Sequence, residues 1–302
     1  MIDESILNRI GNTPLLNIEN IFVKQEQLNP SGSIKDRIAK FIVEKAERKG
    51  LLRKGYTIVE ATSGNTGIAF SFVAAALGYK MHVVMPRGMS TERLQIMKSY
   101  GAKVTLVHKL CVKCAVEKAA RIAGMPRHYA PQQFDNEWNV EENEKLLGRE
   151  ILKSMHKIDA VVAGVGTGGT LIGVGKAVRK KFPRAAVVAV EPKECALLSG
   201  EGYGEHKIFG LHKLAHVCKE HHIEGIGDGF VPPIVSRHRE FIDDVIMVSS
   251  ANAIREAHRI AREYGCFVGP SSGANLLAAK KLRKKGYKNI VTFFPDSGDR
   301  YI

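Results

Sequence analysis

The sequence predicts an α/β protein whose parallel sheets are covered by helices on both faces. Short apolar runs typical of buried strands alternate with helical patterns through most of its 302 residues. Gly-rich turns follow three of these runs, and the chain is longer than one small core usually needs. We therefore expect two α/β lobes, with functional groups on the loops after the carboxyl ends of the strands.

The individual elements follow from this alternation in chain order. Strands are predicted at residues 57–61, 80–86, 103–108, 159–165, 185–192, 244–249 and 289–295. Helices are predicted at residues 65–77, 91–100 and 111–124, and between the later strands. A break near residues 140–145 predicts a smaller, mobile lobe over residues 35–145, and a larger lobe made of residues 1–34 and 146–302.

The composition is that of a globular protein, with 44% hydrophobic and 25% charged residues. The longest apolar run is too short to cross a bilayer, and the acidic start "MIDES" lacks the apolar region of a secretory signal. Five cysteines, an odd and sparse number, favour a reducing compartment over a disulfide framework. We expect a cytoplasmic protein with no membrane partner.

A formal net charge of +14 first suggests a nucleic acid or another anion as the partner. The basic clusters, such as "VRKKFP" and "LRKKGYK", end helical patterns just before Gly or Pro, where cations suit the helix dipole. The sequence has no aromatic interleaving and no zinc-finger or RNA-binding signature. The charge therefore favours anionic small molecules and predicts no nucleic-acid partner.

The stretch "NPSGSIKDRIAKF" (29–41) places Lys35 in the first turn of an expected helix. Ser33 is predicted to be its N-cap, with Asp36 three residues later as in a capping box. The positive end of the helix dipole disfavours a cation at this point. An exposed lysine would be tolerated there at small cost, but an amine that must be neutral to attack a carbonyl benefits from the same position.

The turn "EATSGNTGIAF" (60–70) crowds polar groups where a strand ends and a helix begins. Thr62, Ser63, Asn65 and Thr66 supply three hydroxyls and an amide, and the glycines between them let a ligand approach the backbone. Orphan N–H groups and the helix dipole favour an anion. A well-capped helix would need only two capping residues, so we predict a receptor for a carboxylate.

The turn "AGVGTGGTLIGVGK" (163–176) is a second predicted anion site. Gly164, Gly166 and Gly169 fit the dinucleotide pattern G-x-G-x-x-G, and Glu191 ends the next strand about twenty residues on. The dense core "GTGGT" (166–170) suits a single phosphate equally well. The sequence predicts a phosphate-binding loop here and leaves open which molecule carries the phosphate.

The C-terminal stretch "FFPDSGDRYI" is the third turn. Ser297 follows a strand end and could offer a neutral hydroxyl to a buried heterocycle, although a polar chain end explains it equally well. Lys35 discriminates between the candidate phosphate ligands. A nicotinamide enzyme needs no amine in a first helical turn, whereas a carbonyl cofactor does.

Together these motifs resemble the cysteine synthase (O-acetylserine sulfhydrylase) family of pyridoxal-phosphate enzymes, which includes cystathionine β-synthase. The resemblance covers nearly the whole chain, through "IGNTPLL" (10–16), "NPSGSIKDR" (29–37), "TSGNTG" (62–67), "PQQFDN" (131–136), "GVGTGGT" (164–170), "EGIGDGFVP" (224–232), "GPSSGANL" (269–276) and "PDSGDRY" (295–301). It implies a tryptophan-synthase-β-like fold (fold type II), in which the larger lobe binds the cofactor and the smaller lobe closes on the substrate.

The resemblance also implies roles for the matching positions. Lys35 would carry pyridoxal 5'-phosphate as an internal aldimine and move the substrate's α-proton, while Asn65 would meet the ring hydroxyl and Ser297 the pyridine nitrogen. The phosphate would lie on Gly166, Thr167, Gly168, Gly169 and Thr170. The substrate carboxylate would be bound by Thr62, Ser63, Asn65, Thr66, Gln133 and Gly225. A neutral partner at the ring nitrogen favours β-elimination to an aminoacrylate, to which a nucleophile then adds.

Asp228 departs from the family pattern. Cysteine synthases usually have a small residue at this position, and cystathionine β-synthases have a tyrosine. A carboxylate beside the aminoacrylate would repel hydrosulfide and could serve as a general base for water, as in the related cysteine hydroxyl-lyases. The alternative is that Asp228 caps a loop away from the substrate.

An apparent insertion, "FGLHKLAHVCKEHH" (209–222), is the second departure. Its potential metal ligands are His212, His216, Cys218, His221 and His222. Cys111-x-x-Cys114 adds a second pair, but neither group has complete zinc spacing, so we expect no metal and a loop or helix near the entrance of the site. Cys195 and Cys266 are expected to be ordinary small apolar residues.

The sequence therefore predicts a pyridoxal-phosphate enzyme that catalyses β-replacement on a serine derivative or cysteine. Cysteine synthesis from O-acetyl-L-serine and sulfide ranks first, and conversion of cysteine and water to serine and hydrogen sulfide ranks second. A NAD-dependent dehydrogenase and a basic nucleic-acid-binding protein are the alternatives from other classes. Because the family is usually homodimeric, a homodimer is expected, and a serine acetyltransferase is a further candidate partner.

Overall fold

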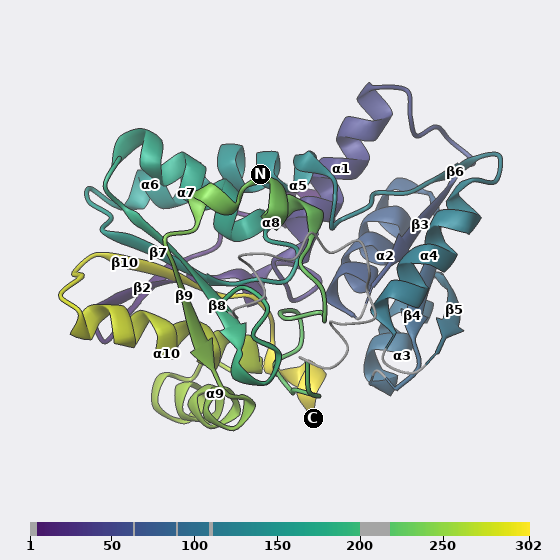
Figure 1. The fold of residues 1–302 in the computed structure, drawn as a ribbon. Helices are drawn as coiled ribbons and strands as arrows, with labels where there is room; N and C mark the ends of the chain where they lie inside the picture. Colours follow the sequence, from purple (N-terminus) through teal and green to yellow (C-terminus); the bar gives the residue numbers. More distant parts are fainter. Residues whose placement is uncertain (1–4, 63, 89, 109–110, 200–217) are drawn as a thin grey trace.

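Two sheets, each packed between helices, make up the fold (Figure 1). The computed structural model describes residues 5–62, 64–88, 90–108, 111–199 and 218–302. Within these ranges a six-stranded sheet has the order β1-β2-β10-β7-β8-β9, and a four-stranded sheet has the order β5-β4-β3-β6. The predicted α/β class with parallel-rich sheets is confirmed.

The larger sheet is parallel except at one edge, where β1 pairs antiparallel with β2. Its strands are β1 (Leu15–Ile18), β2 (Ile21–Gln25), β7 (Ala160–Gly164), β8 (Ala186–Pro192), β9 (Asp244–Val248) and β10 (Ile290–Phe294). The strands β1 and β2 were not among those predicted from the sequence. They are joined at Glu19 and Asn20, whose φ angles of 53° and 59° are those of a tight hairpin turn.

Alternate residues of the larger sheet pack on opposite helical layers, as the period of a strand requires. Val161 and Ala163 belong to the core that includes α6, α7 and α8, whereas Ala160 and Val162 belong to the core that includes α9 and α10. These helices are α6 (Gly148–Ser154), α7 (Gly169–Lys181), α8 (Pro233–Arg237), α9 (Ser250–Tyr264) and α10 (Pro270–Lys284). Both faces are buried, which explains why these strands read as continuous apolar runs.

The smaller sheet is entirely parallel. Its strands are β3 (Thr57–Ala61), β4 (Lys80–Pro86), β5 (Lys103–Val107) and β6 (His128–Tyr129). One face packs on α1 (Lys35–Arg48), α2 (Asn65–Leu77) and α3 (Thr91–Ser99), and the other packs on α4 (Val112–Ala123). The predicted strand and helix ranges agree with these bounds to within a residue or so at each end.

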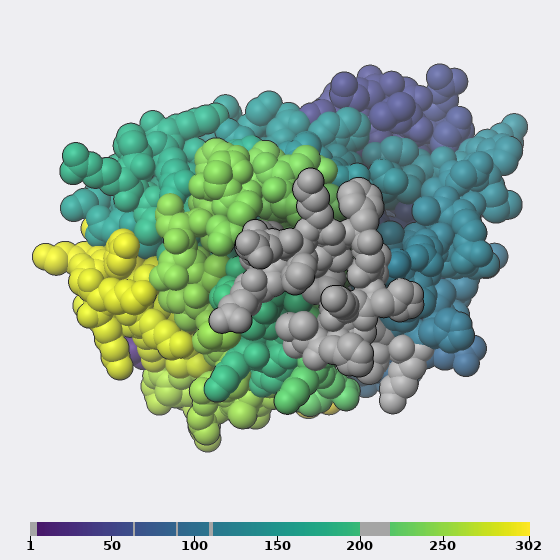
Figure 2. All heavy atoms as spheres, in the orientation of Figure 1, coloured from purple at the N-terminus to yellow at the C-terminus, as the bar shows by residue number. Residues whose placement is uncertain are grey.

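The two sheets occupy opposite ends of the molecule, with α10 at one end and α4 and β5 at the other (Figures 1 and 2). Between them the chain runs through α5 (Glu137–Glu142), a π-helical segment (Asn143–Leu147) and α6 without leaving a helical path. The break expected at residues 140–145 therefore falls inside a helical run rather than in a loop. Short 3₁₀ turns complete the fold at Ile6–Arg9, Glu26–Leu28, Lys193–Cys195, Arg239–Phe241 and Gly298–Tyr301.

Candidate active site

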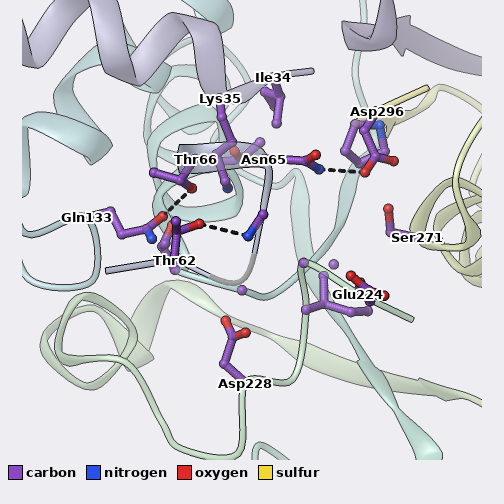
Figure 3. Close-up of a pocket in the computed structure, with 18 of the residues that line it drawn as sticks. Ile34, Lys35, Thr62, Asn65, Thr66, Gln133, Glu224, Asp228, Ser271 and Asp296 are labelled. Carbon is purple, nitrogen blue, oxygen red and sulfur yellow. Dashed lines mark hydrogen bonds between the residues drawn. The ribbon is translucent and has the colours of Figure 1, made fainter. Parts of the chain in front are cut away.

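A cavity lies where loops from the carboxyl ends of both sheets meet, and it gathers most of the predicted site residues (Figure 3). The predicted residues that line it are Lys35, Thr62, Asn65, Thr66, Gln133, Gly166, Thr167, Gly168, Thr170, Gly225 and Asp228. Gly169 and Ser297 do not line it, and Ser63 lies outside the described residues.

Lys35 begins α1 and points its amine into this cavity (Figure 3). Desolvation lowers the pKa of its ammonium below the ordinary 10.5, while the negative charges of Asp228 and Asp296 act in the opposite direction. A lowered pKa leaves more of the amine neutral, which is the form that attacks a carbonyl carbon.

The start of α1 differs from the predicted capping box. Ile34 is the N-cap and makes no side-chain cap bond, whereas the Ser33 hydroxyl accepts a hydrogen bond from the Lys35 N–H at 3.3 Å. Asp36 instead accepts hydrogen bonds from the backbone and hydroxyl of Ser31. The prediction was wrong because the preceding loop folds back onto Asp36, a contact that helix-cap spacing does not report.

The predicted carboxylate receptor is assembled at the start of α2 with help from a distant loop. The Thr62 hydroxyl accepts hydrogen bonds from the N–H groups of Gly64 at 2.9 Å and Gly67 at 3.3 Å, so it also serves the helix start. Thr66 donates to the Gln133 side-chain oxygen at 2.7 Å, and the Gln133 amide donates to the Ala61 carbonyl at 3.0 Å. These bonds orient three polar side chains along one wall of the cavity.

The Gly-rich loop after β7 forms a cradle that a side chain would fill. A Cβ on Gly166 would lie 2.2 Å from the Gly225 carbonyl oxygen, and a Cβ on Gly168, whose φ is +86°, would lie 2.4 Å from Val235. The loop leads into the 13-residue helix α7, which has no acidic residue in its first turn. Its N-terminal N–H groups and dipole suit a phosphate dianion. Gly169 instead packs against Asn139, where a Cβ would lie 1.9 Å from the amide oxygen.

Asp228 lines the cavity on the side opposite Lys35 (Figure 3). Desolvation raises the pKa of its carboxyl above the ordinary 3.8; Lys35 and His221 lower it, and Glu224 raises it. The His221 ring donates to the Gly227 carbonyl at 2.8 Å and accepts from the Ile223 N–H at 3.3 Å, which holds the loop that carries Asp228. The alternative in which Asp228 caps a loop away from the site does not agree with this position.

Ser271 lines the cavity and Ser297 does not (Figure 3). Ser297 bridges to Val268, and its N–H donates to the Gly32 carbonyl at 3.1 Å. Ser271 lies in the quoted motif "GPSSGANL", but a motif alone does not say which of its hydroxyls faces a ligand. Of the two serines, the one that lines the cavity is therefore Ser271.

Five further polar residues line the cavity and were not predicted from the sequence. They are Arg93, Glu224, Asn275, Asp296 and Tyr301. Arg93, from α3, forms an ion pair with Glu224, and its guanidinium lies over the Tyr301 ring at 5.1 Å. All of them except Arg93 lie in the quoted motifs, but they meet only when the two sheets and the C-terminus come together, so the motifs alone do not show that they line one cavity.

Glu191, the acid expected of a dinucleotide fingerprint, is used elsewhere. Its carboxylate accepts hydrogen bonds from the N–H groups of Leu198 at 2.7 Å and Ser199 at 3.0 Å, and it is 2% exposed. It holds the turn after β8 rather than facing the cavity. This removes the main residue that favoured a nicotinamide dinucleotide.

The cysteines correct a second expectation. Cys111 pairs with Cys114, and Cys195 pairs with Cys218, while Cys266 is a free thiol. Cys195 is therefore not an ordinary apolar residue in this structure, and two disulfides are present where none was expected. Counting cysteines could not find the second pair, because its members lie 23 residues apart and meet only through the fold.

Of the potential metal ligands in the insertion, only Cys218, His221 and His222 lie among the described residues. His212 and His216 lie outside the described residues, and Cys218 is in a disulfide. Across the ranges that the structure describes, no three His, Cys, Asp or Glu side chains come together as a metal site would require. In the same ranges no helix is both long and apolar enough to cross a membrane.

Comparison with known proteins gives full-length relatives. A cysteine synthase of Staphylococcus aureus is 41% identical over 312 aligned residues, which cover 99% of this chain and 95% of that protein. A hydrogen sulfide-producing enzyme of Fusobacterium nucleatum has a solved structure that is 34% identical, covers 100% of both chains and superposes with a TM-score of 0.89. Another hydrogen sulfide-producing enzyme, solved as an aspartate-to-asparagine mutant with an α-aminoacrylate intermediate, is 38% identical with a TM-score of 0.86, covering 98% of this chain and 89% of that one.

The family model described as "Pyridoxal-phosphate dependent enzyme" matches residues 6–296. The predicted fold type II is confirmed by the solved relatives, and the predicted cofactor by the family. Family membership also removes the two alternatives from other classes, the dehydrogenase and the nucleic-acid-binding protein. The cradle at Gly166 and Gly168, the start of α7 and the amine of Lys35 fit such a cofactor. The chain belongs to the pyridoxal-phosphate-dependent enzymes, within the group that contains the cysteine synthases.

Proposed function

We propose that this enzyme replaces the β-substituent of L-cysteine with the oxygen of water, which yields L-serine and hydrogen sulfide. One observation carries the proposal: the Asp228 carboxyl lies in the wall of the cavity, opposite Lys35 (Figure 3). Cysteine synthesis ranked first on the sequence alone. The position of Asp228 reverses that ranking.

The cofactor contacts follow from the lining residues. Lys35 would bind pyridoxal phosphate through its amine, and the loop from Gly166 to Thr170 would hold the phosphate. Asn65 would meet the ring hydroxyl and Ser271 the ring nitrogen. When bound, the cofactor withdraws electrons from the α-carbon of the amino acid, so that a β-substituent can leave and a nucleophile can add at the β-carbon.

The substrate would be held by its carboxylate at the start of α2. Thr66 and Gln133 are hydrogen-bonded to each other in the wall of the cavity, and Thr62 and Gly225 also line it. Ser63 belongs to the same expected set. A carboxylate bound there would place the α-carbon within reach of Lys35, whose amine would remove the α-proton and later return it.

Asp228 would act on the incoming water. In the net reaction the bond from the β-carbon to sulfur breaks and sulfide departs with a proton, while the water oxygen bonds to the β-carbon. The Asp228 carboxylate takes the proton that the attacking water loses, and releases it when hydrogen sulfide forms. A carboxyl whose pKa lies above its usual value is a stronger base for this step.

The charge of this wall also selects the nucleophile. Asp228 and Glu224 both line the cavity, and a carboxylate within a few ångströms repels an arriving hydrosulfide anion but not neutral water. Arg93 offsets part of the charge of Glu224 through their ion pair. The balance favours release of hydrogen sulfide over its capture.

The comparisons supply two kinds of support. Hydrogen sulfide-producing enzymes are among the solved relatives, and one was solved as an aspartate-to-asparagine mutant with α-aminoacrylate. Cysteine synthases of 41% identity support the second candidate, synthesis of cysteine from O-acetyl-L-serine and sulfide. Both reactions use the same cofactor and a β-elimination, but they differ in the group that leaves, sulfide or acetate, and in the nucleophile that adds, water or hydrosulfide.

A pair of assays tests the choice. The holoenzyme is given L-cysteine as its only amino acid, and sulfide and serine are measured; in parallel it is given O-acetyl-L-serine with sulfide, and cysteine is measured. We expect equal amounts of sulfide and serine from cysteine, with the higher kcat/KM. Cysteine formation without any serine formation would instead establish the second candidate.

We make further proposals about the movement of the lobes, the oligomeric state and the partners of the enzyme. We propose that residues 35–145 move as a smaller lobe against residues 1–34 and 146–302 and close on the substrate. We also propose a homodimer, as is usual in the family, in the cytoplasm. A serine acetyltransferase would be a partner only if the second candidate reaction holds.

A further inference from the structure

The carboxamide of Asn65 is held on both sides by the C-terminal turn. Its Nδ2 donates to the Asp296 carboxylate at 2.6 Å, and its Oδ1 accepts from the Arg300 guanidinium. Asp296 is held in turn by the Tyr301 hydroxyl, which donates to it at 2.5 Å. An amide nitrogen carries two N–H groups, so this arrangement leaves one for a ligand in the cavity that Asn65 lines.

The same guanidinium also reaches the turn that leads into Lys35. Arg300 donates to the Ser31 carbonyl, and the Ser31 N–H donates to the Asp36 carboxylate at 2.7 Å. Asp36 directly follows Lys35 at the start of α1. One side chain therefore connects the amide on α2 with the backbone that sets the position of the amine.

Arg300 is closely packed. Arg300 is 4% exposed, and a Cβ on Gly32 would lie 2.8 Å from its Nη2 atom. Gly32 has a φ of +83°, so glycine suits this turn for its conformation as well as for its size. The guanidinium fits between the turn and Asn65 because Gly32 has no side chain.

We propose that Arg300 is a positioning residue that fixes the amide orientation of Asn65 and, through Ser31, the approach of Lys35 to the cofactor. The inference rests on the cofactor contacts proposed for these two residues, but not on which nucleophile the enzyme uses. A planar guanidinium can donate to two acceptors at a fixed angle, and an ammonium at the end of a lysine cannot reproduce this geometry. Arg300→Lys therefore keeps the buried charge and removes the positioning.

The test measures cofactor binding rather than turnover. Apoprotein of Arg300→Lys is titrated with pyridoxal phosphate, its thermal unfolding is recorded, and the visible absorption of the loaded protein is compared with that of the wild type. Arg262→Lys, which changes an exposed arginine on α9, is the matched control. We expect affinity about tenfold weaker and a changed ratio of the cofactor's absorption bands, with an apoprotein that melts near the wild-type temperature.

A double-mutant cycle with Asn65→Ala shows whether Arg300 acts through Asn65. If it does, Arg300→Lys costs less affinity in the Asn65→Ala background than in the wild type. Fully additive losses would overturn the proposal, as would wild-type affinity and spectrum in Arg300→Lys. An Arg300→Lys chain that does not fold would also overturn it, because the residue would then serve the fold rather than the site.

Discussion

At the scale of single residues, desolvation raises the pKa values of two buried carboxyl groups, those of Asp228 and Glu60. Burial raises the pKa of Asp228, and it raises the pKa of Glu60 to about 8, although the two carboxyls do different work. Asp228 faces the cavity, whereas Glu60 lies at the end of β3, behind the wall formed by Gln133. Each predicts a pH dependence that a separate measurement can follow.

The raised pKa of Asp228 predicts how the rate of serine formation decreases at acidic pH. Its carboxylate is the basic form, and its pKa is raised from 3.8, so serine formation from cysteine should rise with pH through a value above 3.8. Asp228→Asn should lower this rate about 100-fold or more and remove the decrease at acidic pH. Asp244→Asn, on an exposed residue at the start of β9, is the control. A pH profile unchanged in Asp228→Asn would argue against the base.

Glu60 predicts a loss of stability at alkaline pH. Its carboxyl accepts from the Ala61 N–H at 3.0 Å and has a folded-state pKa of about 8, above the ordinary 4.5. The folded protein therefore holds a proton that the unfolded chain loses between these values, so this contribution to stability decreases as pH rises from about 4.5 to 8. Glu60→Gln should be more stable than wild type by about 1 to 2 kcal/mol at pH near 9 and little changed near pH 5. Urea unfolding at both pH values measures this, and equal curves at alkaline pH would contradict it.

At the scale of elements, loops rather than helices and strands determine which side chains line the cavity. The strands 57–61 and 80–86 and the helix 65–77 could be predicted because periodic apolar residues report them directly. The cap of α1, the choice between Ser271 and Ser297, and the partner of Glu191 could not, because each depends on contacts between distant segments. The sequence therefore predicts the turns that bear the site but not which side chains in them face the ligand.

The phosphate loop gives the sharpest test of an element. Residue 168 has a φ of +86°, which is unfavourable for alanine, and the new Cβ of Gly168→Ala would lie 2.4 Å from Val235. Gly265→Ala is the matched control, since its φ of +67° is also left-handed but no atom lies within 4 Å of the position its new Cβ would take. Both variants carry left-handed strain of about 1 kcal/mol, so the extra loss in Gly168→Ala comes from overpacking against Val235, about 1 to 3 kcal/mol, and this variant should also bind the cofactor more weakly. Equal unfolding midpoints in urea would contradict the close packing.

A buried charge network joins distant parts of the chain at the scale of the whole molecule. Arg37 on α1 donates to Glu26 at 2.6 Å and to Glu150 on α6 at 2.8 Å, and Lys24 donates to Glu150 at 2.7 Å. The Arg37 side chain is 2% exposed, and Glu26 is fully buried. The network connects α1, which packs on the smaller sheet, with segments of the larger one.

Removing Arg37 should therefore weaken the whole fold. Arg37→Met leaves the Glu26 carboxylate buried without its main partner, which costs about 3 to 5 kcal/mol. Arg179→Met, which breaks the more exposed pair with Asp243, should cost about 1 kcal/mol or less. Urea unfolding of both variants measures the difference. Similar losses would show that burial does not set the strength of this network.

The order of motifs predicted the family because several independent motifs recur along nearly the whole chain. It did not predict either disulfide, the hairpin β1–β2 or the cluster of Arg93, Glu224 and Tyr301. Nor could it choose between a carboxylate in the cavity and one that caps a loop. That choice depends on where the loop 224–229 lies relative to Lys35, which is a property of the assembled molecule.

The origin of the oxygen in the product tests the central claim most directly. Holoenzyme is incubated with L-cysteine in heavy-oxygen water, and the serine formed is analysed by mass spectrometry. We expect serine whose hydroxyl carries the heavy oxygen, released with an equal amount of sulfide, and almost no serine from Asp228→Asn. Absence of labelled serine from wild-type enzyme that makes cysteine from O-acetyl-L-serine and sulfide would contradict it.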